Sequence, residues 1–350
     1  MPINLDSNYV RVAGESDVVI NKNVNIFGND VYKIDVNGLG GIFKISSGCS
    51  VLLNNVILTN GNTTYGGAIY NEGIVTIVSS QITGSNASLG GAVYNTGIAT
   101  ISGSILDENT ATDKGGAIYS TNSVQIESST LNDNTATNKG GAVYFEGIAK
   151  IKDVIFDSNN IINRKNMNEY TGGAAIYNVA GTLTVDKSTF RKNLLNYNPG
   201  SGGENRDLVW GVITASGENT ITNSIFEDNS GCYGGDISVG LFDTATASLT
   251  LNNCNFTGTK SYAGSVHLEN GDLSVSNSNF DKCMAYGEGS TGYTAAGGAI
   301  YVNNATVTIK DSNFTNCGNT LGGAIDLDYV VSLSIEGCTF ENNTVSKRGG

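Results

Sequence analysis

The sequence predicts an all-β fold, a single-stranded parallel β-helix of about 11–12 coils. Three observations support this prediction. A five-residue phrase, Gly-Gly-Ala-Ile-Tyr or a close variant, recurs along most of the 350 residues. A second motif, an apolar residue followed by two polar residues and Asn, precedes the next glycine pair, and the residues between the two motifs alternate in polarity. A fixed period of this kind is typical of stacked repeats.

The glycine phrase sets the period of the repeat. Its first four copies start 24, 25 and 25 residues apart. The fourth position is always Ile or Val, which predicts an inward-facing side chain, and strand alternation then places positions three and five outside. Asp236 at position three agrees with this assignment. The copies and variants occupy residues 66–70, 90–94, 115–119, 140–144, 172–177, 210–214, 234–238, 263–267, 297–301 and 322–326.

The second motif predicts two further columns of stacked residues. We expect its apolar position, often Phe, to stack inside the core, and its Asn to form a ladder, because a buried amide needs hydrogen-bond partners. Cys283 and Cys317 take the Asn position in adjacent coils, which would bring their Cα atoms to about 5 Å, within the disulfide range of roughly 4.4–6.8 Å. A disulfide and a pair of buried thiols both fit this spacing. The motif occurs at residues 106–109, 131–134, 156–159, 190–193, 226–229 and 340–343.

Strands connect the two motifs. Runs such as Leu183–Asp186 and Val307–Lys310 alternate apolar and polar residues, while the chain has only 2 prolines and no helical stripe. One coil should therefore contain about three short strands joined by Gly and Asn turns, with about 4.8 Å between coils.

The spacing of the motifs also predicts the domain organisation. Residues 1–22 should form an N-terminal cap or edge strand, and residues 23–350 one continuous β-helix that is truncated within a repeat, since its last two glycines resemble the start of another phrase. Longer spacings place loop insertions at residues 160–171, 194–209 and 284–296, all on one edge. Insertions confined to one face of a solenoid often form its binding face.

The composition argues against several classes of function. A net charge of -13 is unfavourable for binding nucleic acid, which needs a basic surface. No apolar run reaches the roughly 18 residues of a membrane span, and residues 1–10 lack a signal-peptide pattern. The 6 cysteines form neither a CxxC motif nor a zinc-site spacing, so we expect no metal and no cofactor.

Tyrosines at the fifth position of the phrase form the first candidate binding surface. They lie in successive coils and should stack as an exposed stripe that holds sugars or the apolar surface of a partner. The alternative is a cross-strand aromatic ladder that only stabilises the sheet. The tyrosines are Tyr70, Tyr94, Tyr119, Tyr144 and Tyr177.

Two neighbouring insertions carry the second candidate surface. Basic and aromatic residues gather there on an otherwise acidic chain, and Arg guanidinium groups match carboxylates, which suggests recognition of acidic glycans. A solvated loop pair without a ligand is the alternative. The residues are Arg164, Lys165, Tyr170, Tyr197, Arg206 and, at the end of the second insertion, Trp210.

A catalytic site is only weakly indicated. Asp326 and Asp328 should share one face about 7 Å apart, a separation compatible with a glycosidase carboxylate pair or with two calcium ligands. No Lys or Arg accompanies them at neighbouring motif positions, and His267, the single histidine, lies two coils away. We therefore expect a protein that is not an enzyme.

The paired motifs resemble the repeat of chlamydial polymorphic outer membrane proteins, and still more that of the adhesin-like surface proteins of methanogenic archaea. The order of residues 23–28, 34–38 and 42–45 before the first phrase is similar to the opening of the archaeal modules. The resemblance covers roughly residues 20–350. It implies a right-handed, pectate-lyase-like parallel β-helix displayed outside the cell, with glycans or surface proteins of another cell as partners. It also implies flanking repeats or an anchor domain in the full-length protein. It provides no catalytic residues.

These observations lead to one hypothesis and two alternatives. The hypothesis is a non-catalytic, adhesin-like scaffold of the cell surface that presents the insertion edge and the tyrosine stripe to glycans or to host or partner surface molecules. The first alternative is a carbohydrate-active enzyme, either a polysaccharide lyase or a glycoside hydrolase, on the same scaffold. The second alternative is a structural stalk without a ligand.

Overall fold

The computed structural model describes residues 2–162, 171–195, 210–240, 247–285, 297–319 and 322–345. The regular secondary structure of these residues is β-strand, and the strands pair in parallel, which confirms the predicted parallel β-helix. No helix in the described ranges is long and apolar enough to cross a membrane.

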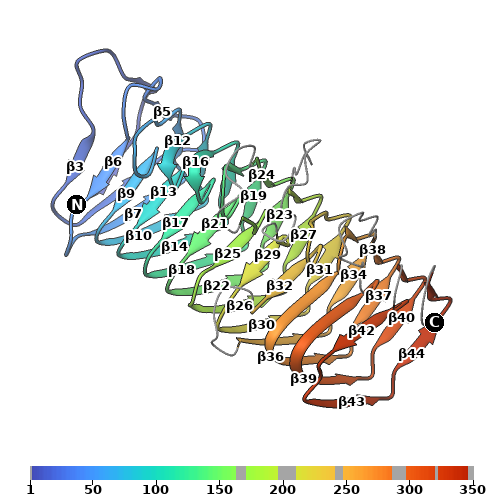
Figure 1. The fold of residues 1–350 in the computed structure, drawn as a ribbon. Helices are drawn as coiled ribbons and strands as arrows, with labels where there is room; N and C mark the ends of the chain where they lie inside the picture. Colours follow the sequence, from blue (N-terminus) through green and yellow to red (C-terminus); the bar gives the residue numbers. More distant parts are fainter. Residues whose placement is uncertain are drawn as a thin grey trace. The chain divides into compact units, whose positions relative to one another are not determined.

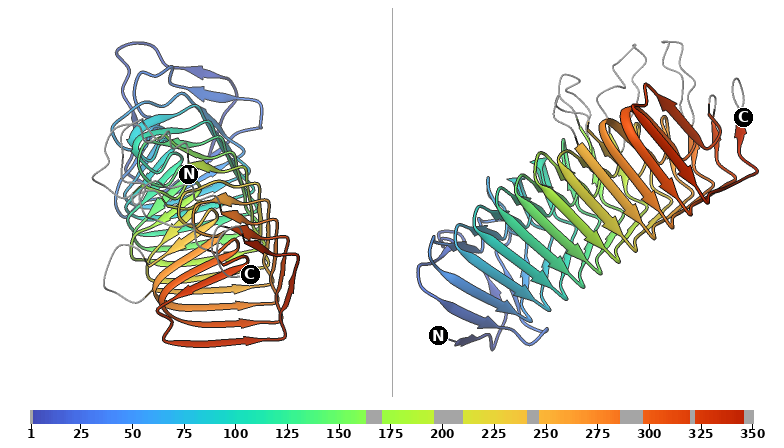
Figure 2. Two further views of the ribbon diagram at one scale, coloured as in Figure 1. Left: turned by 45° about the vertical axis from the view of Figure 1, so that its right-hand side comes forward. Right: turned by 90° about the horizontal axis from the view of Figure 1, so that it is seen from below.

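The chain divides into two compact units. Unit 1 comprises Met1–Ile162 and Ala175–Tyr177, and unit 2 comprises Asn163–Ala174 and Asn178–Gly350. Within each unit, successive coils add strands to the same sheets (Figure 1), and the strands form parallel rows when seen from below (Figure 2).

Most coils contain four short strands, one more than predicted. In the coil after the first glycine phrase, these are β9 (Ile69–Asn71), β10 (Ile74–Val78), β11 (Gln81–Thr83) and β12 (Asn86–Leu89). We refer to them as the first, second, third and fourth strand of a coil. The fourth strand was missed because it lacks an alternating pattern of apolar and polar residues.

The remaining strands of unit 1 follow the same order. The edge strands are β1 (Pro2–Asn4), β2 (Tyr9–Val10) and β3 (Val18–Ile20). The first strands are β6 (Phe43–Ile45), β13 (Val93–Asn95), β17 (Ile118–Ser120), β21 (Val143–Phe145) and β25 (Ile176–Asn178). The second strands are β4 (Val24–Phe27), β7 (Ser50–Asn54), β14 (Ile98–Ser102), β18 (Ser123–Glu127) and β22 (Ile148–Lys152). The third strands are β5 (Lys33–Asp35), β8 (Ile57–Thr59), β15 (Ile105–Asp107), β19 (Thr130–Asn132) and β23 (Ile155–Asp157). The fourth strands are β16 (Thr110–Lys114), β20 (Thr135–Ala136) and β24 (Asn160–Ile161).

In unit 2, β36 and β39 each join a first and a second strand into one. The first strands are β29 (Ile213–Ala215), β32 (Ile237–Val239) and β42 (Ile325–Asp328), and the joined strands are β36 (Val266–Ser276) and β39 (Ile300–Lys310). The second strands are β26 (Thr182–Asp186), β30 (Glu218–Thr222), β33 (Ala247–Asn252) and β43 (Ser332–Glu336). The third strands are β27 (Thr189–Arg191), β31 (Ile225–Glu227), β34 (Asn255–Thr257), β37 (Asn279–Asp281), β40 (Asn313–Thr315) and β44 (Thr339–Glu341). The fourth strands are β28 (Leu194–Leu195), β35 (Lys260–Ser261), β38 (Met284–Ala285), β41 (Gly318–Asn319) and β45 (Thr344–Val345).

Three fourth strands lie at the starts of the predicted insertions. β24, β28 and β38 occupy the first two residues at or within the ranges 160–171, 194–209 and 284–296. The strand pairing of the coil therefore continues two residues further than the motif spacing indicated. The middle of each insertion lies outside the described residues.

Equivalent residues of successive coils stack in register, as the repeat predicts. Ile69 pairs with Val93, Val93 with Ile118, and Ile118 with Val143. All four side chains are fully buried, as the fourth position of the phrase requires. The repeat thus places each motif position in a column that runs along the unit.

The glycine pair forms a tight corner of the coil. Gly66 has a φ of 63°, and a Cβ there would lie 2.1 Å from the Ile69 carbonyl oxygen, so no larger residue fits without distortion. The prediction that position three faces outward is wrong. Ala68 and Asp236 are both fully buried at this position, because the corner interrupts strand alternation just after the glycines.

The two interior columns are confirmed. Phe256 and Phe280 stack in unit 2 with ring centroids 4.5 Å apart and planes within 1°. In unit 1, Asn109 Nδ2 donates to Asn134 Oδ1 (3.1 Å), and Asn134 Nδ2 donates to Asn159 Oδ1 (3.1 Å). The buried amides are therefore satisfied by the neighbouring coil.

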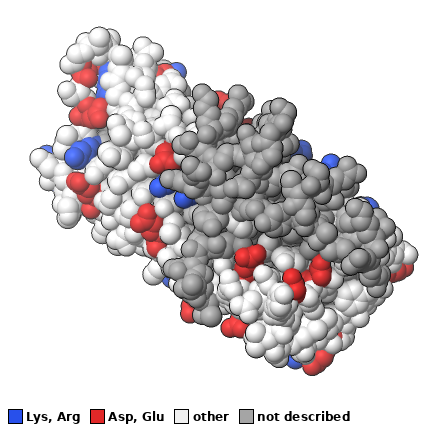
Figure 3. All heavy atoms as spheres, viewed as in Figure 1, with Lys and Arg blue, Asp and Glu red and all other residues white. Residues whose placement is uncertain are grey.

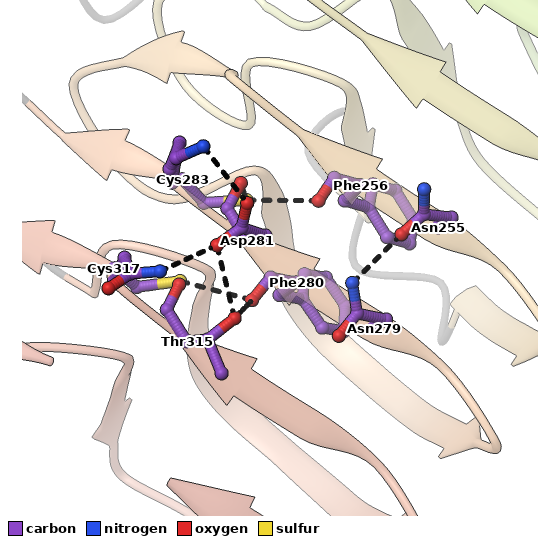
Figure 4. A network of polar contacts seen from close by, with 10 residues as sticks. Asn255, Phe256, Asn279, Phe280, Asp281, Cys283, Thr315 and Cys317 are labelled. Atoms are coloured by element: carbon purple, nitrogen blue, oxygen red, sulfur yellow. Dashed lines mark hydrogen bonds and ion pairs between the residues drawn. The ribbon is translucent and has the colours of Figure 1, made fainter. Parts of the chain in front are cut away.

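The two cysteines in the Asn column are buried free thiols. Cys283 Sγ lies 3.8 Å from the carbonyl oxygen of Phe256, and Cys317 Sγ lies 3.6 Å from that of Phe280 (Figure 4). Of the two arrangements that the sequence allowed, the structure has the pair of thiols. Burial raises the pKa of the Cys283 thiol, which keeps it protonated.

Candidate functional site

The tyrosines of unit 1 form a continuous aromatic stack. Ring centroids lie 5.2 Å apart for Tyr70 and Tyr94, 5.1 Å for Tyr94 and Tyr119, 4.8 Å for Tyr119 and Tyr144, and 5.6 Å for Tyr144 and Tyr177. The planes deviate by 4° to 20° from parallel. Each inner ring therefore gives both of its faces to its neighbours.

The prediction of an exposed stripe is wrong for three of the five tyrosines. Tyr70 and Tyr94 are half-buried, whereas Tyr119, Tyr144 and Tyr177 expose only 8%, 5% and 3% of their surface. These three rings are not available as flat platforms for a sugar. Their geometry is that of the structural ladder, the alternative that the sequence left open.

Charged side chains complete the buried part of the stack. The phenol groups of Tyr119 and Tyr144 both donate to Glu146 Oε1, at 3.0 Å and 3.2 Å. Burial, together with the Glu146 carboxylate, raises the pKa of both tyrosines well above the ordinary value. Lys114 Nζ lies 5.4 Å from the centroid of Tyr144, a cation–π contact.

In three coils of unit 1, the residue before the glycine pair contacts the tyrosine of the next coil. Lys114 reaches Tyr144 in this way, and Tyr65 packs at 5.1 Å on Tyr94. Tyr65 is 46% exposed and was missed by the sequence analysis, which treated only the residues inside the phrase as columns. The feature of the sequence that could have indicated Tyr65 is its position directly before Gly66.

Tyr65, Tyr70 and Tyr94 together form a tyrosine patch at the exposed end of the stack. Tyr65 meets Tyr70 edge-on, at a centroid distance of 6.5 Å. Lys44 Nζ lies 5.0 Å from the Tyr70 centroid, and the Tyr70 phenol donates to Glu72 Oε1 at 3.2 Å. The patch combines partly exposed rings with one cation and one carboxylate.

The same column of unit 2 has a different content. In register, it contains Thr214, Ser238, His267, Tyr301 and Asp326. Small side chains replace the first two rings, and Ser238 Oγ accepts a hydrogen bond from the Gly211 backbone N–H (2.8 Å).

Trp210 and Tyr233 pack around the histidine of this column. The centroid of the His267 ring lies 6.0 Å from Trp210, 5.5 Å from Tyr233 and 4.9 Å from Tyr301, each time edge to face. Trp210, predicted as an insertion-edge binding residue, is itself 6% exposed and acts in this packing.

His267 is buried and bonded on one side. Its Nε2 lies 3.2 Å from Glu269 Oε1, and this contact lowers the pKa of Glu269. Its Nδ1 is buried without a hydrogen-bond partner. A buried polar atom of this kind is uncommon in folded proteins.

Asp326 and Asp328 lie on β42, which pairs with β39, the strand that carries Tyr301. Burial, followed by the charges of Asp328, Glu269 and Asp326, raises the pKa of Tyr301 to about 12. Burial and the neighbouring Asp328 raise the pKa of Asp326. Among the described residues, no group of three or more His, Cys, Asp or Glu side chains is arranged to hold a metal ion. Among these residues, the pair is therefore not joined by a third carboxylate, His or Cys side chain.

Asp236 lies inside unit 2, not on its surface. Its Oδ1 accepts a hydrogen bond from Asn229 Nδ2 (2.9 Å), and its Oδ2 accepts from the hydroxyl groups of Thr259 and Ser265. Thr259 occupies the position that Asn has in the ladder of other coils. The side-chain acceptor for Asn229 Nδ2 is therefore supplied by Asp236. Burial raises its pKa to about 6.

The remaining predicted site residues lie outside the described residues. These are Arg164, Lys165, Tyr170, Tyr197 and Arg206. On the described part of the face in Figure 3, charged side chains are scattered in small groups among uncharged ones.

Two segments of the chain match the Chlamydia polymorphic membrane protein repeat. They are residues 103–121 and 128–146, which run from one second motif through the following glycine phrase in two successive coils. The predicted resemblance to this repeat is confirmed for these segments. Searches of curated proteins and of solved structures found no match to the chain.

Proposed function

We propose that this chain is a non-catalytic, adhesin-like scaffold of a cell surface that binds glycans or surface proteins of another cell. The match of residues 103–121 and 128–146 to the Chlamydia polymorphic membrane protein repeat is the observation that supports it. The β-helix fits this role because its in-register coils hold outward side chains at fixed spacing.

The tyrosine patch is the proposed contact surface of unit 1. Partly exposed aromatic rings beside polar groups suit both sugar rings and the apolar part of a protein surface. Tyr65 offers a ring that is not enclosed in the stack, while Lys44 and Glu72 provide a hydrogen-bond donor and an acceptor next to Tyr70. The buried tyrosines serve to fix this end of the stack in place.

The insertion residues complete the proposal. Arg164 and Arg206 remain candidates for acidic groups of the ligand, because an Arg guanidinium forms bidentate hydrogen bonds with carboxylates.

Binding of the intact chain to a glycan array and to host-type surface proteins tests the proposal. We expect the double variant Tyr65→Ala/Tyr94→Ala to weaken binding by about tenfold or more, as for aromatic anchors of an interface. Tyr329→Ala is the matched control, because Tyr329 is 80% exposed in unit 2 and belongs to neither surface.

The variant Arg164→Ala/Arg206→Ala then measures the contribution of the insertions. Full binding by both double variants would contradict the assigned surfaces. An intact chain that binds nothing would contradict the proposal and support the structural stalk. Cleavage of a polysaccharide that is lost in Asp326→Asn would support the enzyme.

A further inference from the structure

We infer that the tyrosine stack of unit 1 carries one-electron oxidation from the surface to a buried phenol, that of Tyr119. This activity goes beyond the proposed binding function and does not depend on it. The substrate is a one-electron oxidant that reaches the surface from solution, such as a small inorganic radical. The path consists of three rings in contact, Tyr65, Tyr94 and Tyr119, whose centroids lie 5.1 Å apart at both steps.

Tyr65 is the entrance of this path. Its side chain is 46% exposed, whereas Tyr94 is half-buried and Tyr119 is only 8% exposed. An oxidant in solution therefore meets Tyr65 first and takes one electron from its ring. Loss of the electron makes the phenol strongly acidic, so its proton passes to water and a neutral tyrosyl radical remains.

Tyr94 connects the entrance to the buried ring. Its plane is tilted by 51° from that of Tyr65 and lies within 4° of that of Tyr119. Electron transfer between aromatic rings in van der Waals contact is rapid, because their π orbitals overlap. An electron from Tyr119 passes through Tyr94 to the radical at Tyr65, which takes back a proton from water.

The Glu146 carboxylate makes Tyr119 the site where the radical rests. The phenol of Tyr119 donates to Glu146 Oε1 at 3.0 Å, and burial together with this carboxylate raises the pKa of Tyr119. The phenol is thus protonated at neutral pH, and loss of its electron is coupled to transfer of its proton to Glu146. Glu146 is exposed and returns this proton to water. The complete step removes one electron and one proton from Tyr119 and reduces the oxidant by one electron.

Lysine side chains make the other rings of the stack harder to oxidise. A cation above an aromatic ring is attracted by its π electrons, which opposes removal of one of them. The pairs are Lys44 with Tyr70 at 5.0 Å, Lys114 with Tyr144 at 5.4 Å, and Lys139 with Tyr177 at 5.4 Å. Among the residues that the structure describes, Tyr94 and Tyr119 have no such cation, and of these two only Tyr119 donates to a carboxylate.

Burial protects the radical at Tyr119 from further reaction. Tyr94 and Tyr144 cover the two faces of its ring at 5.1 Å and 4.8 Å, which excludes a second radical. Radicals on the exposed Tyr65 of two molecules would instead couple through a carbon–carbon bond to dityrosine. The stack therefore moves the oxidising equivalent away from the tyrosine patch before a cross-link forms there.

Pulse radiolysis of the intact chain at neutral pH tests the inference. Azide radicals remove one electron from aromatic side chains, and the absorption of the tyrosyl radical is then followed in time. Tyr119→Phe keeps the ring in the stack and removes only the phenol group. We expect it to shorten the slowest tyrosyl decay by about tenfold or more, the rate equivalent of one hydrogen bond to a charged group. It should also raise the yield of dityrosine through Tyr65, measured by mass spectrometry.

Three further variants make the test specific. Glu146→Gln keeps an acceptor for the phenol but is a far weaker base, so it should shorten the decay as Tyr119→Phe does. Tyr65→Phe should lower the yield of the long-lived radical. Tyr301→Phe is the matched control and should change neither quantity, because this half-buried ring of unit 2 lies outside the stack. Equal decay in the natural chain, Tyr119→Phe and Glu146→Gln, or a long-lived radical on Trp210 instead of a tyrosine, would overturn the inference.

Discussion

The outward columns of the two units occupy the same position of the repeat but are built differently. In unit 1, five tyrosines stack face to face, and the phenol groups of Tyr119 and Tyr144 share the Glu146 carboxylate. In unit 2, small residues, a histidine, one tyrosine and an aspartate follow each other, and Trp210 and Tyr233 fill space from the adjacent position.

This difference shows where the repeat is free to vary. The inward position keeps Ile or Val in both units, because the coils bury it against their neighbours, completely in all but the last coil, where Ile325 is half-buried. The choice of residue at the fifth position of the phrase is limited only by its neighbours in the column and by the residue before a neighbouring glycine pair. Unit 1 uses this freedom for a ladder that ends in a partly exposed patch, and unit 2 uses it for a polar face.

The largest expected effect comes from opening the stack of unit 1. Tyr144→Ala removes a ring that is 5% exposed and stacked on both faces, so it should lower the free energy of unfolding by about 3–5 kcal/mol. Tyr301→Ala in unit 2 should cost only about 1–2 kcal/mol, since the ring is half-buried. Chemical denaturation measures both, and equal losses would remove the distinction between the columns.

The variant Asp236→Asn tests the buried carboxyl group that unit 2 has at the third position of the glycine phrase. The pKa of Asp236 is raised to about 6 from an ordinary 3.8, so the folded state binds more protons between these pH values. The stability that Asp236 provides is thus present below about pH 4 and is lost as the pH rises to about 6. The variant should be more stable than the natural chain at pH 7 by up to about 3 kcal/mol, and similar to it at pH 4.

Thermal unfolding at pH 4, 5, 6 and 7 checks this prediction. Thr259 and Ser265 can accept hydrogen bonds from the new amide, so the site stays satisfied. Parallel pH profiles of the natural chain and the variant would show that Asp236 does not titrate in this window.

Ser238→Tyr attempts to convert the column of unit 2 into that of unit 1. Ser238 is fully buried and accepts a hydrogen bond from Gly211, and Trp210 and Tyr233 already fill the neighbouring space. The added ring should therefore destabilise the fold by about 1–3 kcal/mol. An unchanged midpoint of urea unfolding would mean that the two columns are interchangeable.

The sequence was sufficient to predict the fold and the columns. The strict Ile or Val at the fourth phrase position identified the inward face, and Ile118 is fully buried as expected. The Phe and Asn motifs likewise led to the observed stack and ladder, because each depends only on the residue one coil away.

Exposure and hydrogen bonding could not be predicted in the same way. The burial of Tyr119 depends on neighbours outside its own column, and the burial of Asp236 depends on a corner geometry that departs from strand alternation. Tyr65 and the unpaired nitrogen of His267 depend on contacts across coils at positions that the phrase does not include. The candidate sites therefore needed three-dimensional placement, whereas the fold did not.

The central claim is that equivalent residues of successive coils lie in one column. A double-mutant cycle of Tyr94→Ala and Tyr119→Ala, followed by urea unfolding, tests this most directly. We expect a coupling energy of about 0.5–1.5 kcal/mol for this stacked pair, and additivity within about 0.5 kcal/mol for Tyr70 and Tyr144, which share no stacking partner. Additivity for Tyr94 and Tyr119 as well would contradict the account.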